Sequence, residues 1–383
     1  MAFIHRHTNG LTAWRAALLL LAALLTVSSA FSASSTASAS GVWTTLAGAA
    51  ELPPPPEAAA SFTGTVTMTF LGDCTLGGES KNRTTATGFI KRVEENGYDY
   101  PMQALKALTK TDDLTVANLE GVLTDRKLKK VQKTYNFSGP TSMTQVLTRA
   151  EIECVTLANN HSHDYGAAGY ADTKAALQAA GVAWFGTDAA ALWESESGLR
   201  IGFIGVNYSL YTSQLNAYTR QMQALRDAGC AAVITVMHAG EEYTQTISGL
   251  QKQIAERAVE AGTDLIVGHH PHVVQGFDLV GGVPVVYSLG NCAFGGARHV
   301  KDTDALVLRA ELAFEAGKLS EITLRFYPIA ITTDERYNDF SPVFLKGDDA
   351  WRVLEKMKQS TGFDVGVLDA ENRATVICAV PEK

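Results

Sequence analysis

The sequence is poor in features that mark several protein classes. Its 383 residues include only five cysteines, an odd number, and no two of them have a CxxC spacing. We therefore expect neither a disulfide framework nor a thiolate metal cage. Cys154 and Cys230 lie in or beside apolar runs and are predicted to be buried free thiols. For Cys74 we also expect packing rather than a role beside a metal.

Positive charge is also scarce. The formal net charge is -8 and no basic face is long, which argues against a nucleic-acid partner. One basic run stands out, and we interpret it as a solvated loop, with a contact for an acidic polymer as the alternative. It consists of Arg126, Lys127, Lys129, Lys130 and Lys133.

Long apolar runs are limited to the N-terminus. Residues 16–27 have the length of a signal-peptide core, shorter than a membrane span, and follow a basic segment. Residues 1–33 are therefore predicted to be a signal peptide or an N-terminal membrane anchor, and in both cases the protein is exported. Residues 34–61 are rich in Ser and Ala and then in Pro, which predicts a linker without a core.

From residue 62 the pattern predicts an α/β domain that ends near residue 330, because short apolar runs alternate with helical stretches. Strands are expected at 65–71, 114–117, 152–157, 182–185, 200–206, 231–236, 264–267 and 284–288. Helices are expected at 101–109, 141–150, 167–180, 214–228 and 248–261. A hairpin at 305–314 and 319–329 follows. Residues 331–383 are predicted to be an extension that packs on the domain, with a helix at 349–359 and a loose tail.

Polar side chains follow six of these expected strands. Three histidines come within the five positions after 264–267, where an open α/β sheet presents its ligand-binding groups. The polar residues, in chain order, are Asp73; Asn118 and Glu120; Asn160, His161 and Asp164; His238, Glu242 and Tyr243; His269, His270 and His272; and Asn291.

This residue set predicts a metal site. Carboxylate and amide oxygens mixed with imidazoles suit one or two divalent ions such as Mn, Fe or Zn at a catalytic centre. A structural zinc site would favour cysteines. Two ions would need a bridging carboxylate and would activate a water molecule between them.

The motifs around these residues resemble a known family. They are GDCTLGGE, ANLEGVLT, LANNHSHDYG, HAGEEY, GHHPHVVQG and VVYSLGN, together with NFSGP at 136–140. In this order they resemble the bacterial CapA/PgsA capsule-synthesis proteins, which are associated with poly-γ-glutamate and are similar to calcineurin-like metallophosphoesterases. The resemblance covers residues 64–330. It implies an α/β metallophosphatase sandwich of two central β-sheets flanked by helices.

The resemblance also implies roles for individual residues. Glu120 would be the bridging carboxylate, and His161, oriented by Asp164, would bond the reacting oxyanion or protonate the leaving group. The other metal ligands would be Asp73, Asn160, His238, His270 and His272, with His269 as the alternate for His270. Five further residues would lie near the substrate or would contact the metal ligands from the side away from the metal: Asn118, His269, Glu242, Tyr243 and Asn291.

Some positions depart from the superfamily or have a simpler interpretation. Thr75 stands where phosphoesterases carry a histidine, and an Asn-Leu-Glu segment replaces their Gly-Asp motif. Asn160 and Asp164 are also candidates for turn or helix-capping residues. Glu242 and Tyr243 could brace a loop, and Asn291 could bond the backbone at the site rim.

The sequence thus predicts an exported metal-dependent hydrolase of capsule or poly-γ-glutamate synthesis or processing. Metal-activated water would attack a phosphoester or an amide of an acidic polymer or another cell-envelope substrate. The alternative is a non-catalytic component of a membrane synthesis and export complex. It would bind acidic chains through the metal centre and the loop at 126–133.

Overall fold

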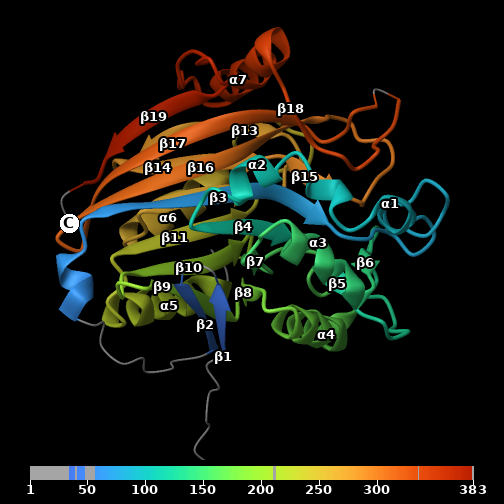
Figure 1. Cartoon of the computed structure of the whole chain (residues 1–383), viewed down its shortest axis with the longest axis horizontal. Coiled ribbons are helices and arrows are strands. Elements are labelled where there is room, and N and C mark those ends of the chain that lie inside the picture. The colour runs from blue at the N-terminus through green and yellow to red at the C-terminus, as the bar shows by residue number, and fades with distance from the viewer. Residues whose placement is uncertain (1–33, 39–40, 48–56, 210–212, 335, 382–383) are drawn as a thin grey trace, which may run out of the picture. The chain divides into compact units, whose positions relative to one another are not determined.

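Two large mixed β-sheets organise the computed structural model, which describes residues 34–38, 41–47, 57–209, 213–334 and 336–381. The predicted leader at 1–33 and the proline run at 53–56 lie outside these residues. The first sheet has the order β1-β2-β9-β10-β11-β12-β14-β13 and is parallel from β10 through β14 (Figure 1). Its strands are β1 (Ser34–Ser38), β2 (Gly41–Ala47), β9 (Ala189–Ser195), β10 (Arg200–Asn207), β11 (Ala232–His238), β12 (Leu265–His269), β13 (Val274–Val280) and β14 (Val283–Leu289).

The second sheet has the order β18-β17-β16-β3-β4-β7-β8. In addition, β15 pairs with β3 and β19 pairs with β17. Its strands are β3 (Gly64–Thr75), β4 (Leu114–Leu119), β7 (Cys154–Thr156), β8 (Ala183–Phe185), β15 (Asn291–Phe294), β16 (Asp304–Glu315), β17 (Lys318–Ala330), β18 (Val343–Phe344) and β19 (Ala374–Ala379). A separate short pair joins β5 (Val122–Leu123) to β6 (Ser138–Gly139).

Helices cover the outer faces of the sheets. Helices α1 to α4 share a buried cluster with the second sheet, and α5 and α6 share one with the first. No helix in the described ranges is both long and apolar enough to cross a membrane. The α-helices are α1 (Phe89–Asn96), α2 (Lys106–Thr109), α3 (Thr144–Arg149), α4 (Gly166–Ala179), α5 (Leu215–Asp227), α6 (Gly249–Glu260) and α7 (Gly347–Thr361), and the 3-10 helices are η1 (Glu57–Ser61), η2 (Tyr100–Met102) and η3 (Thr141–Met143).

The main core lies between the two sheets. Phe70 and Val116 of the second sheet and Phe203 and Val236 of the first belong to one buried cluster. Strands β11 and β12 are buried along their whole length, as expected of parallel strands covered on both faces. The structure therefore confirms the predicted two-sheet sandwich flanked by helices.

Several expected elements are also found. Helix α6 begins after Ser248 with a capping box, in which Ser248 and Gln251 each bond the other's backbone N–H. The predicted hairpin is β16 and β17. The stretch predicted as one helix at 101–109 is instead the 3-10 helix η2 followed by the short helix α2.

The prediction that residues 34–61 form a linker is wrong for 34–38 and 41–47, which form β1 and β2. Strand β2 pairs antiparallel with β9, and Trp43 is 1% exposed, with its ring 5.1 Å from that of Phe203. Averaging composition over the segment hid the short run VWTTL, whose β-branched and aromatic residues favour a strand. Part of the predicted linker is therefore core.

The prediction of a loose C-terminal tail is wrong as well. Residues 374–379 form β19 along the edge of β17, and α7 contributes Val353, Leu354 and Met357 to the core between the sheets. Strands β9 and β13 and helix α1 were not expected. The tail pairs because β17 is long enough to offer it a free edge. The sequence of the tail alone does not show that such an edge is present.

A half-buried carboxylate that directly precedes β7 leads to a pH prediction. Glu153 accepts a hydrogen bond from the Thr115 N–H at 2.7 Å. Burial, reinforced by nearby Asp112, raises the pKa of Glu153 to about 7. The native state then binds this proton more tightly than the unfolded chain. Stability should therefore fall as pH rises from the ordinary glutamate pKa near 4 to about 7.

Glu153→Gln should remove this pH-dependent loss, because the neutral amide can still accept the Thr115 bond. We expect the free energy of unfolding of Glu153→Gln to equal that of the wild type near pH 4 and to exceed it by about 1–3 kcal/mol at pH 8. Urea unfolding in chelator measures both values. Glu196→Gln, in the exposed turn between β9 and β10, is the matched control. An equal difference at the two pH values would contradict the prediction.

Candidate metal centre

The predicted ligand residues meet where the carboxyl ends of β3, β4, β11 and β12 come together. Asp73 on β3 is in register with Asn118 on β4 and with Asn291 on β15, while His238 on β11 is in register with His269 on β12. The approach of β15 to β3 is close: a Cβ on Gly72 would lie 2.3 Å from the Gly290 carbonyl oxygen. The two sheets together thus build one site.

Asp73 is fully buried at the centre of this group. Its Oδ1 accepts a hydrogen bond from Asn118 Nδ2 at 2.7 Å and lies 3.2 Å from His269 Nδ1. Its Oδ2 lies 3.2 Å from His272 Nδ1 and accepts a hydrogen bond from the His270 N–H at 3.3 Å. Asp73 is therefore oriented by side chains from two different strand ends, those of β4 and β12.

Glu120 is also buried, and neither of its oxygens has a hydrogen-bond partner among the residues that the structure describes. Three imidazole Nε2 atoms surround its Oε1, those of His238 at 3.7 Å, His272 at 3.9 Å and His161 at 4.0 Å. Burying an unsatisfied carboxylate is costly unless a cation compensates it. The orphaned oxygens therefore fit a bound metal ion.

Two sets of potential ligands share Glu120. One consists of Glu120, His238 and His270, and the other of Asp73, Glu120 and His272. Within each set the ligand atoms lie within 4.8 Å of one another. The buried acidic and histidine groups could thus hold a metal ion, and Glu120 is placed where one carboxylate can serve both sets.

The electrostatics of this centre are dominated by burial. Burial raises the pKa of Glu120 to about 8, and the neighbouring Asp73 carboxylate contributes to the rise. Burial alone would also raise the pKa of Asp73, but His269 and His272 outweigh it and hold that pKa well below its usual value. Burial and the adjacent His272 lower the pKa of His270 to about 4. A neutral His270 keeps a lone pair for a cation.

The loop after β12 has an unusual backbone. His270 has φ 98° and His272 has φ 56°, in a region that residues with a side chain seldom adopt. The preceding Gly268 is required by packing, since a Cβ there would lie 2.0 Å from the Tyr287 carbonyl oxygen. Such conformations persist only where the surroundings impose them, and they cluster at functional sites.

His161 stands beside the ligand group with its own set of partners. Its Nδ1 lies 2.7 Å from Asp164 Oδ2, and the ring of Phe137 stacks on the imidazole with centroids 4.2 Å apart. The Phe137 N–H donates to the same Asp164 oxygen at 2.6 Å. Burial lowers the pKa of His161, while Asp164 acts in the opposite direction. A carboxylate bonded to an imidazole in this way can orient it as an acid or base.

The remaining predicted residues occupy different places. Asn160 Oδ1 lies 2.8 Å from His238 Nε2, and Asn291 both contacts His272 Nδ1 at 2.9 Å and donates to the His272 carbonyl at 3.3 Å. The Tyr243 ring is 5.8 Å from that of His272. Glu242 is exposed, and its charge acts on Glu120 from a distance.

The capping interpretation does not hold for Asp164 or Asn160. Helix α4 begins at Gly166, and its N-cap residue Tyr165 makes no side-chain cap bond. Asp164 instead directs its carboxylate to His161, and Asn160 directs its amide to His238. Both side chains therefore belong to the site.

Three residues of the site escaped the sequence-based prediction. Asn159 donates through Nδ2 to Asn118 Oδ1 at 3.0 Å and to the Leu119 carbonyl at 2.9 Å, so it orients the Asn118 amide. Lys133 and Phe137 contact the His161–Asp164 pair. Asn159 lies in the motif LANNH and Phe137 in the motif NFSGP. The role of each position nevertheless depends on contacts with residues that are distant in the sequence.

The basic run at 126–133 is divided by the structure. Arg126 pairs with Asp172 at 2.7 Å, and Lys127, Lys129 and Lys130 are exposed. Lys133 instead donates to Asp164 Oδ1 at 2.7 Å. Most of the run is thus solvated as predicted, and its last member belongs to the site.

The cysteines pack as expected. All five are buried and free, which confirms the prediction for Cys154 and Cys230. Cys74, next to Asp73, directs its thiol to the Gly72 carbonyl oxygen at 3.4 Å. Thr75, at the position where related phosphoesterases have histidine, is buried, and its hydroxyl has no hydrogen-bond partner among the described residues.

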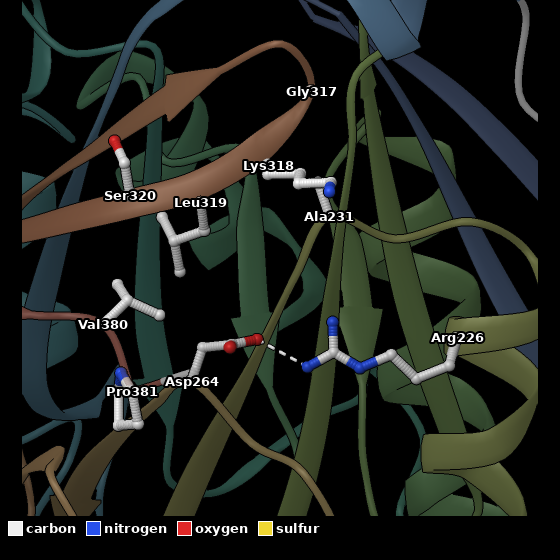
Figure 2. A pocket seen from close by; sticks show the side chains of 9 residues that line it. All are labelled: Arg226, Ala231, Asp264, Gly317, Lys318, Leu319, Ser320, Val380 and Pro381. Atoms are coloured by element: carbon white, nitrogen blue, oxygen red, sulfur yellow. Dashed lines mark hydrogen bonds and ion pairs between the residues drawn. The ribbon is translucent and has the colours of Figure 1, made fainter. Parts of the chain in front are cut away.

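A cavity of about 760 Å³ lies away from this centre, and an ion pair between Arg226 and Asp264 spans part of it (Figure 2). Ala231 and Asp264 directly precede β11 and β12, whereas His238 and His269 end those strands. Seven residues of β11 separate the two regions by roughly 20 Å. The cavity is therefore distinct from the metal centre.

Comparison with known proteins supports the family that these motifs suggest. The model of the family described as bacterial capsule synthesis protein PGA_cap matches residues 67–296. The capsule biosynthesis protein CapA of Bacillus anthracis is 29% identical over 264 residues, which cover 62% of this chain and 62% of the relative. The PGA biosynthesis protein CapA of Bacillus subtilis is 28% identical over 229 residues, which cover 54% and 60%.

The chain thus spans about three fifths of the length of these relatives. The family model covers more than half of the chain, and its match begins within β3 and extends just past β15, so it includes every strand end that carries a candidate ligand. With its two-sheet sandwich of the calcineurin-like type, this chain belongs to the bacterial capsule synthesis protein family.

Proposed function

We propose that this domain is an exported metal-dependent hydrolase that acts on an acidic cell-envelope polymer such as poly-γ-glutamate during capsule synthesis or processing. The observation that carries the proposal is Glu120, a buried carboxylate that two ligand sets share and that has no hydrogen-bond partner within the described part of the chain. A purely structural protein gains nothing from burying such a group. The names of the relatives support the substrate class, and the predicted leader supports export.

Different residues of the chain would bind the metal and transfer the proton. Asp73, Glu120, Asn160, His238, His270 and His272 would hold one or two divalent ions, of the Mn, Fe or Zn type. A bound ion of this kind supplies a Lewis acid and a nucleophilic water at neutral pH.

His161 would handle a proton at its Nε2. A carboxylate only accepts hydrogen bonds, so the contact with Asp164 places a proton on His161 Nδ1 and leaves Nε2 directed towards Glu120. From there Nε2 can bond a developing oxyanion or pass a proton to a leaving group of a phosphoester or an amide. The stacked Phe137 ring keeps water from one face of the imidazole.

The test compares wild type, His161→Ala and Asp73→Ala in metal content and in hydrolysis of a phosphodiester and of poly-γ-glutamate. We expect His161→Ala to keep its metal and to lose activity by about 10²- to 10⁴-fold, the contribution typical of a general acid or base. Asp73→Ala should lose metal as well as activity. Absence of turnover by the wild type on every substrate, with polymer binding intact, would overturn the hydrolase.

That outcome would favour a second function, a non-catalytic polymer-binding component of a membrane synthesis and export complex. The exposed Lys127, Lys129 and Lys130 beside the site favour it, because clustered cations attract an acidic chain. Replacing these three lysines by glutamate should abolish polymer binding without changing metal content. If the protein is an enzyme, the same replacement should leave its hydrolysis of a small phosphodiester with an uncharged leaving group unchanged.

A further inference from the structure

Several hydrogen bonds attach segment 131–137 to the turn that carries His161. The Val131 N–H donates to the Asp164 carbonyl at 2.9 Å, and Asn136 Nδ2 donates to the same carbonyl at 3.3 Å. The Phe137 N–H binds the Asp164 carboxylate. Apart from its last two residues the segment is exposed and outside any helix or strand. Its polar contacts are thus concentrated on one turn of the site.

Lys133 makes the central contact between segment 131–137 and this turn. Its ammonium donates to Asp164 Oδ1 at 2.7 Å and to the Asn160 carbonyl at 2.9 Å, and it lies 3.2 Å from His161 Nδ1. Asp164 is 0% exposed, so this ion pair is far less screened than one at the surface. One cation therefore touches the carboxylate that orients His161 and the backbone of the preceding candidate ligand.

The geometry also says where Lys133 acts. It approaches the Nδ1 side of His161, while Nε2 on the other side of the ring faces Glu120 at 4.0 Å. A group bound between His161 and Glu120 would therefore be out of reach of the ammonium. Lys133 can influence that group only through Asp164, Asn160 and His161.

We propose that Lys133 is a positioning residue that locks the Asp164 carboxylate against His161 Nδ1 and thereby fixes the tautomer and direction of the imidazole. Without Lys133, Asp164 Oδ1 would lose the hydrogen bond from the ammonium. Among the described residues, the contacts left to the carboxylate would then be those of Oδ2 with the Phe137 N–H and with the imidazole itself. The role in turnover rests on the proposed hydrolytic function. The effect on the His161 tautomer does not.

The test uses the full chain loaded with zinc, whose diamagnetism permits NMR. Lys133→Met removes the charge and keeps the length, and Lys133→Arg restores a donor. Lys110→Met, at an exposed lysine that lies 3.9 Å from Glu151, is the matched control. Three quantities are measured: bound zinc, the ¹⁵N shifts of His161 assigned with His161→Ala, and kinetics on bis(4-nitrophenyl) phosphate.

We expect Lys133→Met to bind zinc like the wild type and to show a mixture of His161 tautomers in place of the Nδ1–H form. Its kcat should fall roughly 10- to 100-fold with KM unchanged, the range seen when a residue supporting an active-site ligand is lost. Lys133→Arg should recover the tautomer and most of the kcat, and Lys110→Met should match the wild type throughout.

The outcomes separate the two proposals. A wild-type His161 tautomer in Lys133→Met overturns the positioning role whether or not the protein is an enzyme. A changed tautomer in a protein that hydrolyses nothing supports the positioning role and overturns the hydrolase. A fall in kcat with an unchanged tautomer, or a loss that Lys133→Arg does not restore, also contradicts the inference.

Discussion

Glu120→Gln is expected to weaken metal binding at both ligand sets at once. Glu120 is the one residue that the two sets share, and an amide offers neither the negative charge nor the second anionic oxygen. The loss of affinity should exceed about 100-fold, beyond the range typical of residues that only support a ligand. Titration with Zn²⁺ and Mn²⁺ measures it.

The same substitution should have the opposite effect on the protein in chelator. Both Glu120 oxygens are buried and find no hydrogen-bond partner in the described ranges, so the carboxylate costs folding free energy unless a cation binds. In EDTA we expect Glu120→Gln to be more stable than the wild type by up to about 2 kcal/mol, and in excess metal to be less stable. Unfolding curves under the two conditions measure the reversal.

Glu241→Gln is the control for charge, because Glu241 is exposed and its backbone carbonyl accepts a hydrogen bond from Thr244 within its own turn. It should leave both metal affinity and stability unchanged. If Glu120→Gln bound two equivalents of metal as tightly as the wild type, a shared position for Glu120 would be ruled out.

Trp43→Ala should destabilise the fold by about 3–5 kcal/mol, the cost of deleting a large aromatic side chain from a core. Trp43 lies opposite Trp193 in the β2–β9 register, 1% exposed. Val42→Ala on the same strand is the control, since Val42 is 44% exposed and should change stability by less than about 0.5 kcal/mol. Urea unfolding in chelator compares the two.

Equal stabilities of Trp43→Ala and Val42→Ala would mean that residues 41–47 behave as the linker that their composition suggested. The comparison therefore tests where the folded unit begins. The composition of 34–61 could not locate this boundary, because the few β-forming residues at 42–46 are diluted by Ser, Ala and Pro around them.

Ligand positions at strand ends could be predicted because strand geometry is regular. Asp73, Glu120 and His238 each stand at or just after the end of a buried run, and parallel strands bring their carboxyl ends to one edge. Local apolar pattern therefore suffices to gather them. It does not give distances, and it could not show that both oxygens of Glu120 lack hydrogen-bond partners among the residues described by the structure.

The choice between His269 and His270 could not be made in this way. His269 ends β12 and faces Asp73, whereas His270 lies one residue beyond the strand at φ 98° and joins Glu120 and His238. Once the chain leaves the strand, the alternation of side chains no longer tells which way each one points. The surrounding fold imposes that backbone conformation.

By itself, then, the sequence determined the alternating α/β pattern, the family motifs and the residue types that converge at the strand ends. Only the tertiary structure decided that β2 and β19 complete the two sheets, that Asn159 orients Asn118 and that Lys133 reaches Asp164. The physical reason is the range of the interactions. Strand patterns and caps arise from neighbouring residues, whereas sheet edges and buried polar contacts depend on partners that are distant in the chain.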